Sequence, residues 1–134
     1  KGKKPVQLDE QAAVECRRVL SAFFAEMTEW EQYMEQAGFE DAEAVPRLLV
    51  IWEKYVSEKP RMGFRPLGLS YSAQGTYKGE QFLDAEQITR NKLYIYTREK
   101  NTGFDRRFLM KRVGEVWMID GVQERLDGWQ RIGL

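Results

Sequence analysis

The chain of 134 residues carries 21 basic and 21 acidic residues and no histidine. Its net charge of zero favours neither a nucleic-acid nor a membrane partner. The missing histidine removes the side chain most used for proton transfer near neutral pH, and the single Cys16 excludes an intrachain disulfide or a multi-cysteine zinc site. No apolar run approaches the roughly 20 residues of a membrane span. We therefore expect a cytoplasmic protein without metal or cofactor, with a solvated leader over residues 1–7 and one domain over residues 8–134.

The N-terminal part is predicted to form two helices. Asp9 can cap the first, which extends to about Gly38. Its apolar residues recur every three or four positions and predict one buried stripe: Cys16, Leu20, Phe23, Met27, Trp30 and Met34. The second helix is expected from about Pro46, a residue suited to a first turn, to Ser57. Its buried face should comprise Val45, Leu48, Leu49, Trp52, Tyr55 and Val56.

The C-terminal part is predicted to form a sheet. After a break over residues 59–66, a short strand is expected from Leu67 to Ala73, followed by a weakly patterned segment over residues 74–86. Three β-branched and aromatic runs between residues 90 and 120 are separated by a polar link at 99–103 and a turn at 113–115. Such short connections require antiparallel strands. The alternation in residues 93–97 puts bulky side chains on both faces, which indicates a curved sheet or one covered on both sides.

A last strand over residues 129–134 should follow a turn at Asp127-Gly128. Two helices followed by strands predict an α+β domain, in which the helices pack on one face of an antiparallel sheet.

The charges are divided unevenly. Residues 8–58 hold twelve acidic and four basic side chains, whereas residues 89–112 hold eight basic and two acidic ones. Either these are solvated faces that help to hold the layers together, or they form a polarised surface for a charged protein partner. In the second case the binding candidates are carboxylates of the first helix and the loop after it: Glu29, Glu35, Glu40, Asp41 and Glu43. The alternative location is the basic strands around Arg98, Arg106 and Arg107.

No nucleotide-binding loop, serine-hydrolase motif or metal-binding helix motif is present. Without histidine, catalysis would need carboxylates, tyrosines or lysines in a pocket. Asp84 and Glu86 are expected on one solvent face of an extended segment, and Asp120 is expected in a turn. Cys16 should be a small buried hydrophobic residue. We therefore predict no catalytic residue.

Several fragments occur in an order and spacing that resemble a known family. They are Phe24-x-x-Met27-x-x-Trp30-Glu31, Ile51-Trp52-Glu53-Lys54-Tyr55, Gly68-x-Ser70-Tyr71, Ile95-Tyr96-Thr97, Gly103-Phe104, Gly114-x-x-Trp117-x-Ile119-Asp120 and Gly128-Trp129. From about Ala22 to Leu134 the chain resembles immunity proteins of bacterial polymorphic toxin systems with the nuclear transport factor 2-like fold, including those beside Rhs-type toxins. It keeps Tyr77 and Glu80 but lacks the prolines of the family's frequent Tyr-Asp-Pro-Glu segment.

The resemblance implies a cone-like fold, with helices in the concavity of a curved sheet, and an inhibitor in place of an enzyme. The implied partner is a cognate toxin domain, which the protein would neutralise by stoichiometric occlusion without a cofactor. The resemblance leaves open whether the protein forms a homodimer. Toxins of these systems are often nucleases, whose substrate grooves are basic.

The alternative in the same fold is a pocket enzyme of the isomerase or dehydratase type, resembling ketosteroid isomerase. Such an enzyme would need an ionisable group inside an apolar cavity. Large side chains are expected to fill the cone instead: Phe23, Met27, Trp30, Trp52, Tyr94, Tyr96 and Trp117.

Overall fold

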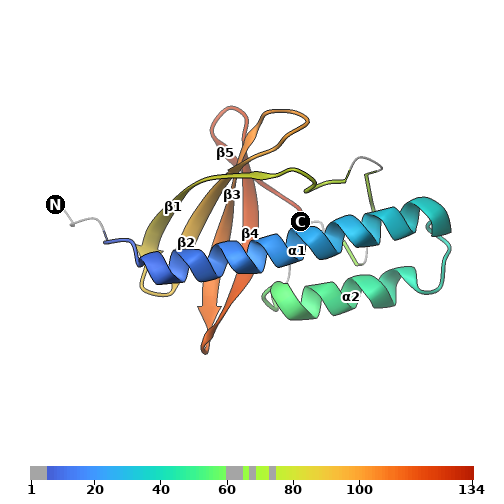
Figure 1. Cartoon of the computed structure of the whole chain (residues 1–134), viewed down its shortest axis with the longest axis horizontal. Helices are drawn as coiled ribbons and strands as arrows, with labels where there is room; N and C mark the ends of the chain where they lie inside the picture. Colours follow the sequence, from blue (N-terminus) through green and yellow to red (C-terminus); the bar gives the residue numbers. More distant parts are fainter. Residues whose placement is uncertain (1–5, 60–64, 67–68, 73–74) are drawn as a thin grey trace.

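The computed structural model describes residues 6–59, 65–66, 69–72 and 75–134. Two helices, α1 (Glu10–Ala37) and α2 (Ala44–Tyr55), precede five strands. The strands are β1 (Gln81–Thr89), β2 (Lys92–Arg98), β3 (Asp105–Val113), β4 (Val116–Arg125) and β5 (Trp129–Ile132). They form one antiparallel sheet in the order β1-β2-β3-β4-β5. Helix α1 crosses one face of the curved sheet, and α2 packs beside α1 (Figure 1).

This arrangement confirms the predicted α+β architecture, with both helices on one side of an antiparallel sheet. Neither helix among the described residues combines the length and apolar character needed to cross a membrane. Most of the expected leader, residues 1–5, lies outside the described residues, and Val6 and Gln7 are exposed.

Helix α1 begins and ends where its capping residues predict. The Asp9 carboxylate accepts hydrogen bonds from the amides of Gln11 and Ala12. At the other end Gly38 has a φ of 84°, a conformation that favours glycine, and its amide donates to the Met34 carbonyl. All six residues of the predicted stripe are buried, including Cys16.

Helix α2 starts two residues earlier than predicted and ends at Tyr55. Leu49 was predicted to be buried but is 38% exposed, whereas Ile51 is buried. The reason is the helical spacing: Leu48, Ile51 and Trp52 lie at positions i, i+3 and i+4, so they share the face that packs on α1.

The first strand lies later in the chain than predicted. Leu67, Gly68 and Ala73 of the expected strand lie outside the described residues, and residues 69–72 form no strand. The first strand is β1, whose opening residues fall in the segment judged weakly patterned. Because β1 is an edge strand with mostly exposed, polar side chains, it lacks a strong alternating pattern. The predicted turns after β2, β3 and β4 are confirmed.

The inner face of the sheet packs on α1. Leu93, Ile95, Phe108, Met110 and Ile119 are completely buried there. Between the layers, four rings lie with centroids 5.1–6.2 Å apart: Phe23, Phe24, Tyr77 and Phe108. Large aromatic side chains therefore fill the space between α1 and the sheet.

Tyr94 and Tyr96 do not contribute to this interior, contrary to the prediction. They alternate with the buried Leu93, Ile95 and Thr97, and therefore lie half-buried on the outer face of the sheet.

Asp120 is also placed differently from the prediction. It lies within β4, at an irregularity of the pairing with β3. Ile119 pairs with Met110 and Gly121 pairs with Leu109, so Asp120 is an extra residue of β4 between them. Its buried carboxylate accepts hydrogen bonds from the Ser57 hydroxyl and, at 2.9 Å, from Lys59 Nζ. Asp120 thus connects the end of α2 to the sheet, and the predicted turn at this position is wrong.

Candidate functional site

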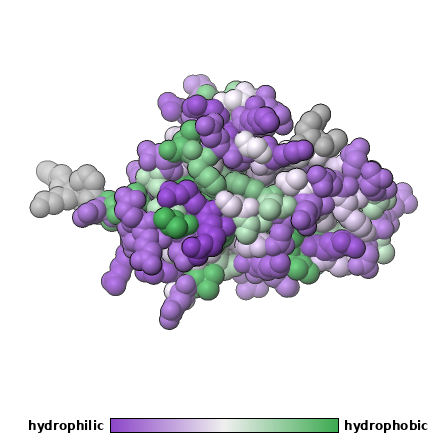
Figure 2. Space-filling model, viewed as in Figure 1, coloured by the Kyte–Doolittle hydropathy of each residue, from purple (hydrophilic) through white to green (hydrophobic). Residues whose placement is uncertain are grey.

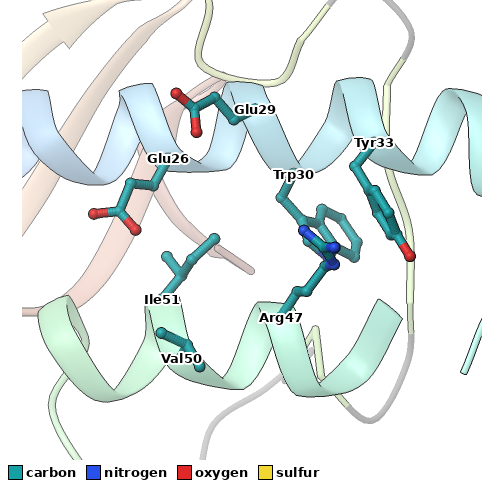
Figure 3. A pocket seen from close by; sticks show the side chains of 7 residues that line it. All are labelled: Glu26, Glu29, Trp30, Tyr33, Arg47, Val50 and Ile51. Atoms are coloured by element: carbon teal, nitrogen blue, oxygen red, sulfur yellow. The ribbon is translucent and has the colours of Figure 1, made fainter. Parts of the chain in front are cut away.

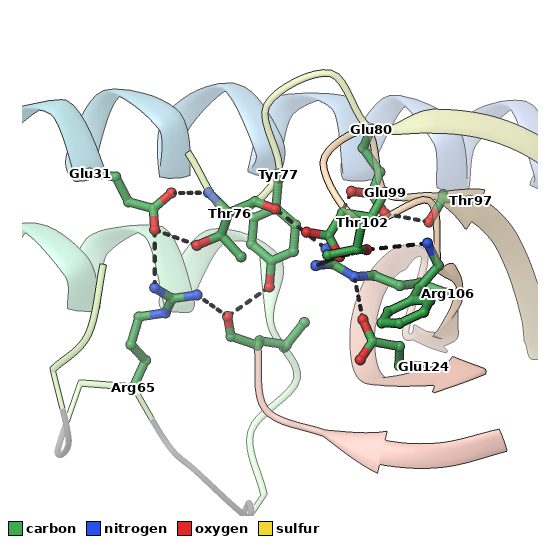
Figure 4. A network of polar contacts seen from close by, with 12 residues as sticks. Glu31, Arg65, Thr76, Tyr77, Glu80, Thr97, Glu99, Thr102, Arg106 and Glu124 are labelled. Carbon is green, nitrogen blue, oxygen red and sulfur yellow. Dashed lines mark hydrogen bonds and ion pairs between the residues drawn. The ribbon is translucent and has the colours of Figure 1, made fainter. Parts of the chain in front are cut away.

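One buried carboxylate, that of Glu31, collects hydrogen bonds from a long connecting segment. Its side chain is 1% exposed and accepts from the amides of Ser72, at 3.0 Å, and Thr76, at 2.7 Å. The Thr76 hydroxyl also donates to it, and Arg65 Nη1 lies 3.4 Å away (Figure 4). The hydrogen bonds compensate for the burial of this carboxylate, and they hold the chain after α2 against α1.

Arg65 and Tyr77 extend this cluster to the end of the sheet. Arg65 donates to the carbonyl of Ser70 and to the main-chain oxygen of Leu134, which also accepts from the Tyr77 hydroxyl at 2.6 Å. Burial raises the pKa of Tyr77 to about 12, so its hydroxyl remains a donor at physiological pH.

A second buried cluster is centred on Arg106 of β3. Its guanidinium lies 2.9 Å from Glu99, 3.3 Å from Glu80 and 3.7 Å from Glu124 (Figure 4). The side chains of Arg106 and Glu80 are 7% and 1% exposed. Burial raises the pKa of Glu80, although the Thr97 hydrogen bond and the charge of Arg106 act in the opposite direction. The guanidinium is therefore the counter-ion for three carboxylates.

A pocket enzyme of this architecture would need an ionisable group inside an apolar cavity that a substrate can reach. Glu31 and Glu80 are buried carboxylates, but their oxygens accept hydrogen bonds from protein groups. Among the residues that the structure describes, no three His, Cys, Asp or Glu side chains are grouped as a metal ion would require. The clusters can hold the fold together, and their chemistry requires no ligand.

An open groove lies on the solvent side, between α1 and α2. It has a volume of about 350 Å³ and is lined by Glu26, Glu29, Trp30, Tyr33, Arg47, Val50 and Ile51 (Figure 3). Its floor is apolar, and Val50 is 52% exposed. The Arg47 guanidinium lies 4.2 Å from the centre of the Tyr33 ring. An apolar floor with a charged rim is an arrangement that also occurs in protein interfaces.

Glu26 and Asp41 are already used for intramolecular contacts. Lys54 Nζ lies 3.0 Å from both carboxylate oxygens of Glu26, which also accepts from the Tyr55 hydroxyl. Burial raises the pKa of Glu26, but these bonds outweigh it, so the pKa lies below its ordinary value. Asp41 accepts from the Tyr33 hydroxyl and from the amide of Glu43, so it organises the turn before α2.

The other predicted binding residues are presented to solvent. Glu29, Glu35, Glu40 and Glu43 are exposed, and none makes a side-chain hydrogen bond or ion pair within the described part of the chain. Glu29 and Glu35 lie on α1, and Glu40 and Glu43 lie on the connection to α2. The end of the molecule where the two helices are joined has a mostly hydrophilic surface (Figure 2). Of the five candidates, four are therefore free to meet a partner, and Asp41 has a structural role.

The three arginines of the alternative location are not equivalent. Arg98 is exposed and bound to Asp105, with Nε 2.8 Å from the carboxylate. Arg106 is buried in its cluster, whereas Arg107 lies on the outer face of the sheet, between Tyr94 and Trp129. Only Arg98 and Arg107 can therefore take part in binding at this location.

A helix packed into the concavity of a curved antiparallel sheet, with a filled interior, defines an α+β protein of the nuclear transport factor 2-like fold. Residues 15–133 match the family described as NTF2 fold immunity protein. The match covers nearly the whole chain, and the protein belongs to this family. Comparisons with curated proteins and with solved structures gave no match.

Proposed function

We propose that the protein binds the toxin domain of its own polymorphic toxin system and neutralises it by covering the toxin's active surface, one molecule per toxin. The observation that carries the proposal is the family match over residues 15–133. Among the described residues, large aromatic side chains pack between α1 and the sheet, and this packing supports inhibition by surface contact. In this proposal the protein acts in the cytoplasm, needs no cofactor and turns over no small molecule.

The first prediction tests this function directly. Co-expression with the toxin polypeptide encoded beside it should rescue cells, and isothermal titration of the purified pair should show saturable binding at unit stoichiometry. The control is co-expression with the toxin of an unrelated system, which should remain toxic because each immunity protein fits its own toxin. Full toxicity of the adjacent toxin, with the folded protein confirmed in the cells, would contradict the proposal.

We further propose that the contact surface is the acidic side of the helices, around the α1–α2 groove. A toxin that holds phosphate in a basic groove would be attracted by the unpaired carboxylates of Glu29, Glu35, Glu40 and Glu43. The exposed Val50 and the apolar floor beneath it would supply the buried centre of the interface.

A second prediction tests this surface by charge reversal. The triple variant Glu29→Lys, Glu35→Lys and Glu40→Lys should associate with the toxin at least about tenfold more slowly at low salt, because electrostatic steering is lost. Its association rate should also depend less on salt. Asp41 is left unchanged, because its carboxylate holds the turn before α2. The measurement is stopped-flow association at several salt concentrations.

The matched control reverses three other exposed carboxylates, Asp84, Glu115 and Asp127, on the sheet and its turns. Both triple variants should unfold at temperatures close to that of the unmodified protein, since exposed substitutions change the free energy of unfolding by only about 0.5 kcal/mol each. Equal association rates for the two variants would place the toxin contact elsewhere.

A further inference from the structure

The outer face of the sheet carries an ordered set of aromatic and basic side chains that the proposed function does not use. Alternation along each strand puts Tyr94 and Tyr96 on this face, together with Arg107. The register places Tyr96 opposite Arg107, and Arg107 opposite Gln123. Trp129 of β5 completes the set, which we call the outer sheet cluster. Both helices lie on the other face (Figure 1).

Arg107 is the centre of the outer sheet cluster. Its guanidinium carbon lies 4.1 Å from the centre of the Tyr94 ring and 4.4 Å from that of Trp129. Nε donates to Gln123 Oε1 at 2.6 Å, and Nη1 lies 3.4 Å from the Tyr96 hydroxyl. Within the described residues Nη2 has no hydrogen-bond partner. The guanidinium is therefore held in one orientation with a donor left for an outside group.

The charge on this face has the opposite sign to that of the helices. Alternation and register assign to it six basic side chains and three acidic ones, a surplus of three positive charges. The basic ones are Lys92, Arg98, Arg107, Lys111, Arg125 and Arg131, and the acidic ones are Asp84, Glu86 and Asp105. A basic toxin groove would be repelled here, and two copies of the face would repel each other. Charge complementarity requires an acidic partner.

The chemistry of the cluster favours a protein over a nucleic acid. Base stacking needs open ring faces, but Arg107 covers one face of both Tyr94 and Trp129. Asp84 and Glu86 share the surface with them and would repel phosphate. Arginine, tyrosine and tryptophan together are the residue types that dominate the binding energy of protein interfaces.

We propose that the outer sheet cluster is a second protein-binding surface, whose partner is a protein that presents carboxylates, with Arg107 donating to one of them. The inference goes beyond the proposed function, because it concerns the face opposite the helices and a partner of the opposite charge. The aromatic rings around Arg107 would form the apolar centre of the contact.

The experiment uses poly-L-glutamate as a carboxylate-bearing polypeptide probe and the ¹⁵N-labelled protein at low salt. Titration should shift the side-chain NMR signals of Trp129 Nε1 and Arg107 Nε in a saturable way. The variant Arg107→Gln should bind about tenfold more weakly, since charge-assisted hydrogen bonds are the strong ones. Arg107→Lys, which keeps the charge but loses the planar fork, should show an intermediate loss.

The matched control is Arg90→Gln, which removes the same charge from an exposed turn residue between β1 and β2. It should leave the affinity unchanged. Equal weakening in both variants would overturn the proposal, as would shifts spread over the whole protein. If oligothymidylate shifted the same two NMR signals and bound more tightly than poly-L-glutamate, the face would be assigned to nucleic acid. A dimer that Arg107→Gln dissociates would assign it to a second copy of the chain. Because the probe is not the toxin, none of these results depends on the proposed function.

Discussion

Replacing Arg106 by methionine is expected to lower the free energy of unfolding by about 3–5 kcal/mol, the usual cost of removing one partner from a buried ion pair. The physical reason is that Glu80, whose side chain is 1% exposed, would lose its counter-ion while it remains out of water. Glu99 and Glu124, partly exposed, would lose the same guanidinium. Urea unfolding followed by circular dichroism measures the change.

A double variant separates the charge from the packing. Adding Glu80→Gln to Arg106→Met removes the unpaired charge and should restore part of the lost stability, so the two effects should be clearly non-additive. The matched control, Arg90→Met in the exposed β1–β2 turn, should change the free energy of unfolding by no more than about 0.5 kcal/mol. A loss below about 1 kcal/mol for Arg106→Met would mean that water replaces the guanidinium.

Replacing Trp30 by alanine should cost about 3–5 kcal/mol, the range for emptying a buried aromatic site. Trp30 is 3% exposed and lies under the α1–α2 groove. Its indole Nε1 also donates to the carbonyl of Ala44 at 3.0 Å, so it joins α1 to the first turn of α2. Thermal and urea unfolding would measure the loss of stability.

Two variants test the separate contributions of Trp30. Trp30→Phe keeps most of the apolar volume and loses the hydrogen bond. This substitution should lower the free energy of unfolding by more than the roughly 1 kcal/mol of an ordinary hydrogen bond, because the Ala44 carbonyl loses its partner. Trp129→Ala, at a half-buried position on β5, should destabilise the protein less than Trp30→Ala does. If both tryptophan-to-alanine changes cost the same, the core assignment of Trp30 is wrong.

The parts of the fold with strong periodicity were predicted from the sequence. The stripe from Cys16 to Met34 and the caps at Asp9 and Gly38 determine α1, and the short turns determine the antiparallel order of the later strands. Edge strand β1 was predicted only in part, as an extended segment with Asp84 and Glu86 on one solvent face, since a strand with mostly exposed side chains has no apolar period. The position of Asp120 inside a strand was not predicted, because an irregularity in strand pairing does not show in the alternation of apolar and polar residues along the sequence.

Two buried charges carried a signal that could have revealed them. Glu31 lies four residues after Met27 and three before Met34, which is the spacing of the buried stripe. Arg106 lies two residues before Phe108, so the period of a strand puts it on the inner face. Their partners Arg65 and Glu80 had no such signal, because contacts 34 and 26 residues apart depend on the folded connections.

Among the binding candidates, exposure could be predicted but intramolecular use could not. Glu29 and Glu35 are exposed, as their positions on α1 indicate. Asp41 is also an acidic residue of the acidic helical half, yet its carboxylate accepts hydrogen bonds from the Tyr33 hydroxyl and from the backbone of the following turn. Helical periodicity places residues on faces and contains no information about hydrogen bonds made across a turn.

The division between buried and exposed charges has a consequence for how such a protein can diversify. The charges that the fold requires, Glu31, Glu80 and Arg106, are enclosed with their partners. Glu29, Glu35, Glu40 and Glu43 make no side-chain hydrogen bond or ion pair within the described residues, so mutations there should change the free energy of unfolding little. Selection can therefore alter the proposed contact surface on α1 in small steps, each leaving a folded protein, while the enclosed ion pairs keep the scaffold unchanged.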